Sequence, residues 1–287
     1  MLSLLKLEES APDFSQVEAL AKGHAHLLEL GVNALELLPP ADSDDNLTWG
    51  YGTANYFAAD FDLGRADSQP APTASTDLVN LIKVCHQKGL RFFYDAVMAF
   101  SRNTAYRNVN FLNFYVQWNT GDPEQVGREA FGGDLFKYNY WVEGYHPITG
   151  KRDRFVPARE YMKAHIAHWI DYYRVDGLRL DSVNNIANYN FLQEFKDYAR
   201  SLWAFEWSVR KLIDCRLLGF SDGSQAVNYV TSHDVEGFGN ERLYNYLENS
   251  GIVYKEKYIK LAFVCLLTAV GVPMILAGEE FADESML

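Results

Sequence analysis

The sequence is poor in cysteine, with only three among 287 residues. Cys85, Cys215 and Cys265 lie far apart in apolar surroundings and show neither a C-x-x-C pair nor the spacing of metal ligands. A disulfide framework and a zinc site are therefore not indicated, and we expect buried free thiols. The sequence predicts no metal ion and no cofactor.

Positive charge is also scarce, because 38 acidic residues outnumber 26 basic ones and leave a net charge of −12 at pH 7. A nucleic acid or an anionic membrane surface would require a basic patch that neutralises phosphates. We therefore expect neither kind of partner. A neutral substrate is easier to reconcile with this composition.

No apolar run of membrane-spanning length is uninterrupted. The best candidate, 261–278, is broken by Thr268, Gly271 and Pro273, which favours a buried helix that turns into a buried strand. Residues 1–9 lack a basic region, a long apolar stretch and a small-residue cleavage site. We find no export signal and expect a cytoplasmic protein.

Helix-like and strand-like segments alternate along the chain. A capping box at 15–18 begins a helical stripe that ends at Gly31, and the apolar run 32–38 has the length of a buried parallel strand. Further strands are expected at 90–95, 175–181, 226–232 and 272–276, and further helices at 78–85, 162–173, 191–198 and 258–269. This alternation predicts βα units around a parallel sheet.

One stretch interrupts the alternation. Between Asp95 and the helix at Met162 the sequence is dense in Asn, Gly and aromatic residues and has no sustained period of 2 or 3.6. It is too long for an ordinary βα loop. We therefore expect an irregular insertion over residues 100–160, within one barrel domain that spans residues 1–287.

Three expected strands end in acidic positions, namely Asp95, Asp181 and the pair His233 and Asp234. The C-terminal ends of parallel barrel strands open on one face, so these side chains would converge there. Any single Asp could instead cap the following helix. For Asp181 this is less convincing, because Arg179 points to the same side of the strand and would keep the carboxylate ionised.

The segments that carry these acids resemble motifs of the α-amylase superfamily, glycoside hydrolase family 13. The segment 175–181 is similar to the family's strand-4 motif, and 227–234 is similar to its strand-7 motif. Further similar segments are 89–95 for strand 3, 49–51 for the sugar-stacking segment after strand 1, and 271–280 for strand 8. The five motifs occur in the family's order, so the resemblance implies an α/β fold with a (β/α)8 TIM-type barrel.

The resemblance implies an α-glucan-active retaining glycoside hydrolase or transglycosylase of the amylase, debranching or branching type. Asp181 would be the nucleophile, and Arg179 would orient it. Asp234 would bind the 2- and 3-hydroxyls of the sugar, contacts that strengthen toward the oxocarbenium-like transition state. His233 would add a hydrogen bond to the same hydroxyls.

Further substrate-binding residues follow from the same resemblance. Trp49 and Tyr51 would offer aromatic faces to the glucose ring, although packing in the core would also explain them. Asp95 is expected among the substrate-binding residues. The partner would be an α-1,4 or α-1,6 glucan.

The sequence also departs from the family pattern. Ala99 and Phe100 stand where the strand-3 motif usually has Asn and His, which puts a calcium site and one sugar contact in doubt. From Asp181 to Asp234 the chain advances 53 residues, whereas three βα units of a ~250-residue barrel take roughly 90. We therefore expect an incomplete barrel, shortened internally and truncated after strand 8.

The shortened stretch leaves the acid/base Glu of the family unassigned. Glu206 is the natural candidate, because it is the only acid between Asp197 and Asp214. It also opens an amphipathic segment, where an acid is already explained by the helix dipole. We predict that Glu206 is not at the separation of about 5–5.5 Å from Asp181 that a retaining pair needs. The chain would then hydrolyse α-glucans very slowly or not at all.

Two alternatives stay open. One is a catalytically impaired α-glucan-binding barrel that lacks the acid/base Glu. The other is a barrel enzyme whose strand-end acids bind a metal, against which the absence of clustered His residues argues.

Overall fold

The structure, a computed structural model, describes residues 2–4, 31–44, 49–64, 73–118, 121–146, 149–202, 227–232, 242–269 and 271–282. The strands are β1 (Leu2–Leu4), β2 (Ala34–Leu37), β3 (Ala41–Ser43), β4 (Thr53–Ala59), β5 (Arg91–Val97), β6 (Phe100–Ser101), β7 (Asp134–Leu135), β8 (Val142–Tyr145), β9 (Arg152–Phe155), β10 (Gly177–Asp181), β11 (Val227–Asn228), β12 (Val272–Pro273) and β13 (Ile275–Leu276). The helices are α3 (Ala74–Gln87), α4 (Ala105–Phe114), α5 (Pro157–His168), α6 (Val183–Ile186), α7 (Tyr189–Leu202), α9 (Leu243–Asn249) and α10 (Lys255–Thr268).

The central sheet has five parallel strands in the order β10-β5-β2-β1-β13. A short parallel pair, β11 and β12, continues this order, because only Met274 separates β12 from β13. The first strand of the chain thus lies between the second strand and the last one, as it does when a parallel sheet curls into a barrel. Within the described ranges the sheet does not close, and β10 and β13 are its two edge strands.

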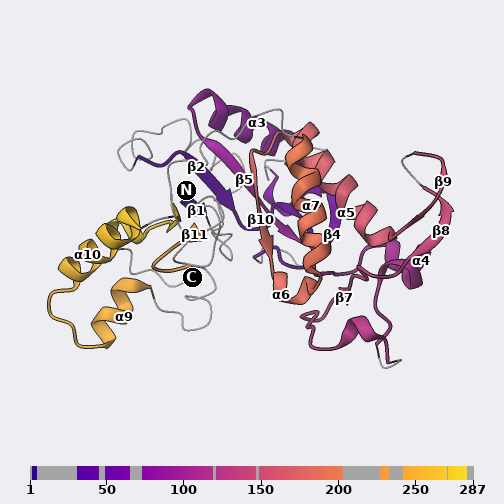
Figure 1. Cartoon of the computed structure of the whole chain (residues 1–287). Helices are drawn as coiled ribbons and strands as arrows, with labels where there is room; N and C mark the ends of the chain where they lie inside the picture. Colours follow the sequence, from indigo (N-terminus) through magenta and orange to yellow (C-terminus); the bar gives the residue numbers. More distant parts are fainter. Residues whose placement is uncertain are drawn as a thin grey trace.

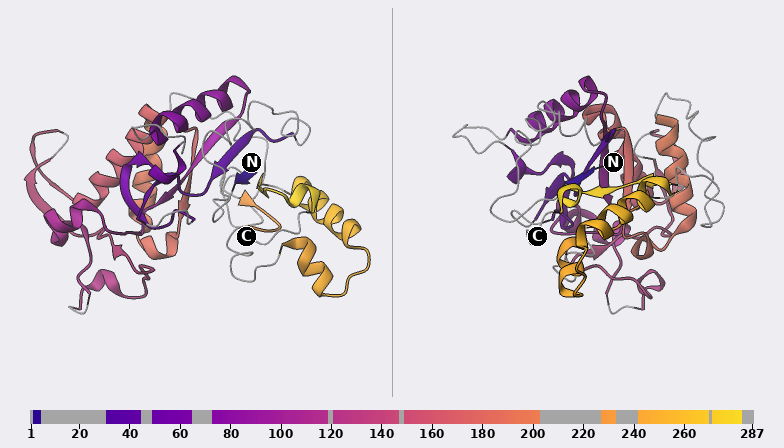
Figure 2. Two further views of the ribbon diagram at one scale, coloured as in Figure 1. Left: turned by 180° about the vertical axis from the view of Figure 1, so that it is seen from behind. Right: turned by 90° about the vertical axis from the view of Figure 1, so that its left-hand side faces the viewer.

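The helices that follow or precede these strands cover the sheet unevenly. Helix α3 packs against β5, and α5 packs against both β4 and α7. Figures 1 and 2 show these three helices grouped around β5 and β10, while α9 and α10 lie beyond β1 at the opposite end of the molecule. The predicted α/β class with a parallel sheet is therefore confirmed.

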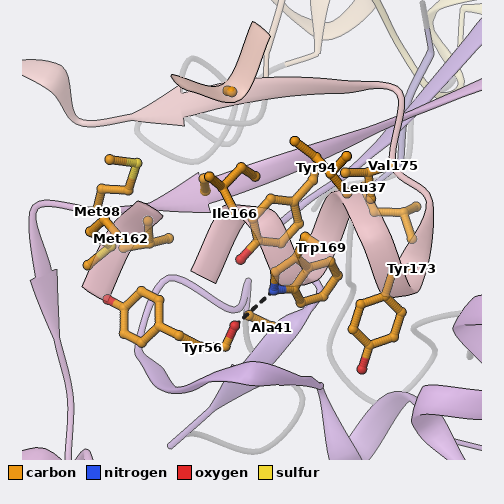
Figure 3. Packing of buried hydrophobic residues seen from close by; sticks show 14 of the residues in the cluster. Leu37, Ala41, Tyr56, Tyr94, Met98, Met162, Ile166, Trp169, Tyr173 and Val175 are labelled. Atoms are coloured by element: carbon orange, nitrogen blue, oxygen red, sulfur yellow. Dashed lines mark hydrogen bonds between the residues drawn. The ribbon is translucent and has the colours of Figure 1, made fainter. Parts of the chain in front are cut away.

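An aromatic stack forms the centre of the core on the α5 side of the sheet. The Trp169 ring lies between Tyr94 and Tyr173, with centroid distances of 4.1 and 4.3 Å. Its indole Nε1 donates a 2.8 Å hydrogen bond to the carbonyl oxygen of Tyr56 on β4 (Figure 3). Trp169 opens a π-helical turn, Trp169–Tyr173, which ends at Arg174 with φ of +66°. This packing links β4 and β5 to the turn that leads into β10.

The late helix α10 is where the expected burial is wrong. The predicted helix is present, but Leu261, Val264 and Leu267 are exposed, and only Ile259 and Leu266 are buried. The physical reason is that residues 261–267 of α10 are apolar on every side, whereas the helix meets the rest of the described chain along one side only. Among the helices of the described ranges, none is long and apolar enough to cross a membrane.

The cysteines on α3 and α10 differ in burial in the same way as the helices that carry them. Cys85 on α3 is a buried free thiol, as predicted, and burial raises its pKa to about 12. Cys265 on α10 is exposed, so the expectation of burial is wrong there. Cys215 lies outside the described residues.

The stretch between β5 and α5 contains two antiparallel pairs, β6 with β7 and β8 with β9, together with α4. Helix α4 was not expected from the sequence, because its periodicity is weak. The helix lacks a side-chain cap and contains Asn110 with non-helical angles (φ −154°, ψ 60°). Buried hydroxyls hold its start, since Tyr115 contacts Ser101 at 3.0 Å and Thr104 at 2.8 Å.

Candidate active site

Four ionisable side chains share one face of the sheet. Arg179 on β10 lies directly opposite Asp95 on β5, and Asp181 follows two residues later on the same face. Glu36 on β2 is paired in register with Phe93, which is two residues before Asp95 and therefore also on this face. The parallel pairing of three neighbouring strands thus brings three carboxyl groups to one arginine.

Arg179 is the centre of this group. Its Nη1 lies 2.5 Å from Oδ2 of Asp95 and 3.1 Å from Oδ1 of Asp181. The same nitrogen donates a 2.9 Å hydrogen bond to the Tyr51 hydroxyl, which in turn donates to Oδ2 of Asp95 at 2.8 Å. The predicted contact between Arg179 and Asp181 is therefore present.

Neither carboxylate caps a helix. Asp181 is the last residue of β10, and the short helix α6 is preceded by Ser182 at its N-cap. Asp95 lies inside β5, two residues before the strand ends, and the next helix begins after Thr104. The helix-cap interpretation thus fails for both residues.

Burial dominates the electrostatics of the site. Asp95 is fully buried, and burial raises its pKa to about 8 although Arg179 acts in the opposite direction. Burial likewise raises the pKa of Glu36 to about 7. The neighbouring acids hold the pKa of Arg179 above its ordinary value, so its guanidinium stays charged. Glu36 and Asp95 together therefore retain a proton near neutral pH.

The two carboxyl oxygens of Asp95 differ in their hydrogen bonding. Its Oδ2 receives the contacts from Arg179 and Tyr51, whereas its buried Oδ1 accepts no hydrogen bond within the described ranges. A buried polar oxygen without a partner is costly, and a ligand hydroxyl can supply the missing bond, since it can accept from the protonated acid or donate to the ionised one.

The sequence analysis did not single out Glu36. A signal was nevertheless present, because Glu36 is the only charged residue in the apolar run 32–38. A strand that is buried on both faces seldom carries an unpaired carboxylate, so this residue marks the inward face of the sheet.

The aromatic residues Trp49 and Tyr51 lie next to the charged group. Both are partly buried and pack against Leu38 and Leu276, so core packing accounts for part of their surface. The Tyr51 ring also lies 5.8 Å from the Arg179 guanidinium carbon. At Gly52, between Tyr51 and β4, an added Cβ would meet the side chains of Asp44 and Arg102.

Three residues named by the sequence analysis are not located. His233, Asp234 and Glu206 lie outside the described residues. Ala99 and Phe100 are both buried and offer no metal ligand. Across the described ranges, no group of three or more His, Cys, Asp or Glu side chains is suited to hold a metal ion.

Comparison with known proteins gives a consistent match. The family model described as Alpha amylase, catalytic domain, matches residues 24–206, which is more than half of the chain. The chain is 28% identical to Isoamylase 3, chloroplastic, of Oryza sativa subsp. japonica over 177 residues, 54% of this chain and 20% of that protein. It is 26% identical to the 1,4-alpha-glucan branching enzyme GlgB of Pseudomonas putida over 220 residues, 74% of this chain and 24% of that protein.

Solved structures show the same fold. An alpha-amylase from Anoxybacillus has a TM-score of 0.71 at 17% identity, covering 98% of this chain and 66% of that one. A pullulanase type I from Bacillus subtilis in complex with maltose has a TM-score of 0.66 at 18% identity, covering 99% of this chain and 50% of that one. These neighbours are TIM-barrel enzymes of the α-amylase type. The chain spans about a fifth to a quarter of the length of the two curated relatives.

Proposed function

The chain belongs to the α-amylase catalytic-domain family of glycoside hydrolases, and on this premise we propose that it is a retaining α-glucan hydrolase or transglycosylase with Asp181 as its nucleophile. The observation that supports this most is the contact of 3.1 Å between Arg179 Nη1 and Asp181 Oδ1 at the C-terminal end of β10. One curated relative is named an isoamylase and the other a 1,4-alpha-glucan branching enzyme, in line with an α-glucan substrate.

The chemistry assigned to Asp181 follows from its surroundings. A retaining enzyme attacks the anomeric carbon with an ionised carboxylate and forms a covalent glycosyl-enzyme. Arg179 contacts one oxygen of Asp181 and favours its ionised form, which is the form that a nucleophilic carboxylate needs. Arg179 is itself held by Asp95 and Tyr51, so the guanidinium cannot turn away from Asp181.

We assign sugar binding to the residues around this pair. The Oδ1 of Asp95, which has no partner within the described ranges, would hydrogen-bond a sugar hydroxyl, as donor while Asp95 is protonated and as acceptor once it is ionised. Asp234 and His233 would bind the 2- and 3-hydroxyls, and Trp49 and Tyr51 would contact the apolar face of the ring. We further propose that the strand order β10-β5-β2-β1-β13 belongs to an incomplete eight-stranded barrel, with residues 100–160 as its irregular insertion.

An activated substrate tests the role of Asp181 separately from the question of the acid/base residue. Fluoride leaves a glucosyl fluoride without protonation, so attack by Asp181 on α-maltosyl fluoride needs no general acid. We expect a burst of fluoride release and a covalent maltosyl adduct on the peptide that contains Asp181, detected by mass spectrometry. Asp181→Asn should abolish both while keeping the unfolding temperature.

The matched control is Asp171→Asn, which changes an exposed carboxylate in the turn that precedes β10. It should leave the fluoride burst unchanged. Fluoride release that persists in Asp181→Asn would mean that the nucleophile is misassigned. Binding of maltooligosaccharides without any adduct would favour the alternative of a catalytically impaired glucan-binding barrel, for which the short interval between Asp181 and Asp234 speaks.

A further inference from the structure

A buried arginine connects the insertion to the chain just after β10. Arg128 is only 8% exposed. Its Nε donates a 2.5 Å hydrogen bond to the carbonyl oxygen of Asn185, and its Nη1 and Nη2 donate to the carbonyl oxygens of Glu124 (2.9 Å) and Phe136 (3.0 Å). Two of these carbonyls belong to the insertion, and the third lies four residues after Asp181.

Arg128 forms no ion pair with any carboxylate of the described chain. Burial lowers the pKa of its guanidinium, and the nearby acids Glu124 and Asp122 only partly oppose this effect. A charge taken out of water in this way adds little to stability, because hydrogen bonds to carbonyls must offset the lost hydration. Arg128 therefore holds its three carbonyls in one geometry more than it stabilises the fold.

The segment that Arg128 holds is residues 182–187, which comprise the one-turn helix α6 and one strained residue on each side of it. We refer to this segment as the turn. Residues 182–187 connect Asp181 to α7, and both Ser182 (φ +50°) and Ala187 (φ +52°) adopt the left-handed conformation that non-glycine residues rarely adopt. Each such residue costs on the order of 1–3 kcal/mol and persists only when its surroundings enforce it.

Asn185 is the point at which the surroundings act on the turn. Its carbonyl accepts the bond from Arg128, and its Oδ1 accepts a 2.8 Å bond from the backbone N–H of Glu129. Its Nδ2 donates a 2.8 Å bond to the hydroxyl of Ser182, the residue next to Asp181. Arg128 and Glu129, two consecutive residues of the insertion, thus hydrogen-bond to Asn185, which in turn hydrogen-bonds to Ser182.

We propose that Arg128 is a positioning residue for Asp181, acting through Asn185 and Ser182, so that the insertion orients the nucleophile. This inference rests on the proposed function, because it takes Asp181 to be the reacting group. The insertion then contributes to the geometry of the active site.

Hydrogen exchange tests the clamp without any need for activity. In Arg128→Met the amides of residues 182–187 should exchange about tenfold faster or more, because the loss of about 1.4 kcal/mol of local stability has that effect. The control is Arg107→Met in the same insertion, where Arg107 is half exposed and pairs with Asp134 at 2.8 Å without contacting the turn. Exchange at 182–187 that is equal in the two folded variants would overturn the proposal.

The burst of fluoride release tests the consequence for Asp181. At saturating α-maltosyl fluoride, the burst rate of Arg128→Met should fall by about tenfold or more, while the substrate concentration at half-saturation changes by less than about threefold. Arg128→Lys keeps the charge and part of the hydrogen bonding, so it should restore part of the rate and serves as the readout if the Met variant does not fold. Arg107→Met should match the unsubstituted chain.

Asn185→Ala provides a further check, because it removes the hydrogen bond from the Asn185 side chain to the Ser182 hydroxyl. Its effect on the burst should not add to that of Arg128→Lys, since both act on the same turn. Full additivity, or an unchanged burst in a folded Arg128 variant, would contradict the proposal. If the unsubstituted chain gives no maltosyl adduct, the proposed function fails, and the exchange measurement still decides whether Arg128 clamps the turn.

Discussion

Arg179 lies directly opposite Asp95 in the register of β10 and β5, and its Nη1 contacts Oδ2 of Asp95 at 2.5 Å. The same guanidinium serves Asp181 and faces Glu36, so a single positive charge lies among three carboxyl groups. The protonation of the site, and with it the stability of the fold, should therefore depend on pH near neutrality.

The first prediction concerns Asp95→Asn, which mimics the protonated acid. Because the pKa of Asp95 is raised from 3.8 to about 8, the folded chain holds this proton more tightly than the unfolded chain. Its contribution to stability is thus present below about pH 4 and is lost as pH rises to about pH 8, by up to about 1.4 kcal/mol per pH unit. The variant lacks this loss. Its free energy of unfolding should therefore increase relative to that of the unsubstituted chain as pH rises from about 4 to about 8.

Urea unfolding at several pH values across the window measures the difference. Asp171→Asn, at an exposed site, should show a difference from the unsubstituted chain that does not change with pH. A constant difference for Asp95→Asn as well would mean that Asp95 is ionised throughout.

The second prediction concerns Arg179→Met. Above about pH 8, where Asp95 of the unsubstituted chain is ionised, removing the guanidinium leaves this buried carboxylate without a counter-charge, which should lower the free energy of unfolding by about 3 kcal/mol. Adding Asp95→Asn should recover part of the loss, because no buried charge then remains at that position. The control Arg91→Met removes a largely exposed arginine that pairs with Asp176 at 2.9 Å, and it should cost less than about 1 kcal/mol. Equal losses at the two sites would argue that Asp95 does not need Arg179.

The third prediction concerns the packing on the inward face of β10. A Cβ on Gly177 would lie 2.7 Å from Cε1 of Phe93, so Gly177→Ala must displace the ring that lies beside the charged group. We expect a loss of about 1–3 kcal/mol in chemical unfolding. Gly144→Ala on β8 is the matched control, because nothing lies within 4 Å of the added carbon, and it should stay within about 0.5 kcal/mol.

The fourth prediction concerns Glu206. Because the sequence predicts a helix start at Glu206 rather than a strand end, Glu206→Gln should leave the slow hydrolysis of a maltooligosaccharide unchanged within about twofold. Reducing-end assays on both proteins, with Asp181→Asn as the inactive reference, measure this. Brisk hydrolysis that is lost in Glu206→Gln would restore Glu206 as the acid/base and complete the active site.

Much of the fold could be predicted because local patterns carry it. The apolar stripe of α3, the glycine after it and the hydrophobic run of β5 follow from side-chain periodicity, and the same reasoning located β2, α5 and α10. Helix α4 escaped this reasoning because tertiary contacts of Tyr115, rather than its own periodicity, hold it. The exposure of α10 escaped it as well, because periodicity shows that a helix is apolar and not what it packs against.

For the candidate site, the sequence by itself determined that the side chains of Arg179 and Asp181 lie side by side, since residues two apart on one strand must share a face. Only the tertiary structure decided that Glu36 and Tyr51 join them, because strand register and the path of the segment before β4 bring together residues more than 100 positions apart. The same holds for Arg128, whose hydrogen bond to the carbonyl oxygen of Asn185 joins residues 57 positions apart. Such contacts depend on how whole elements pack, and no local pattern in the chain encodes that packing.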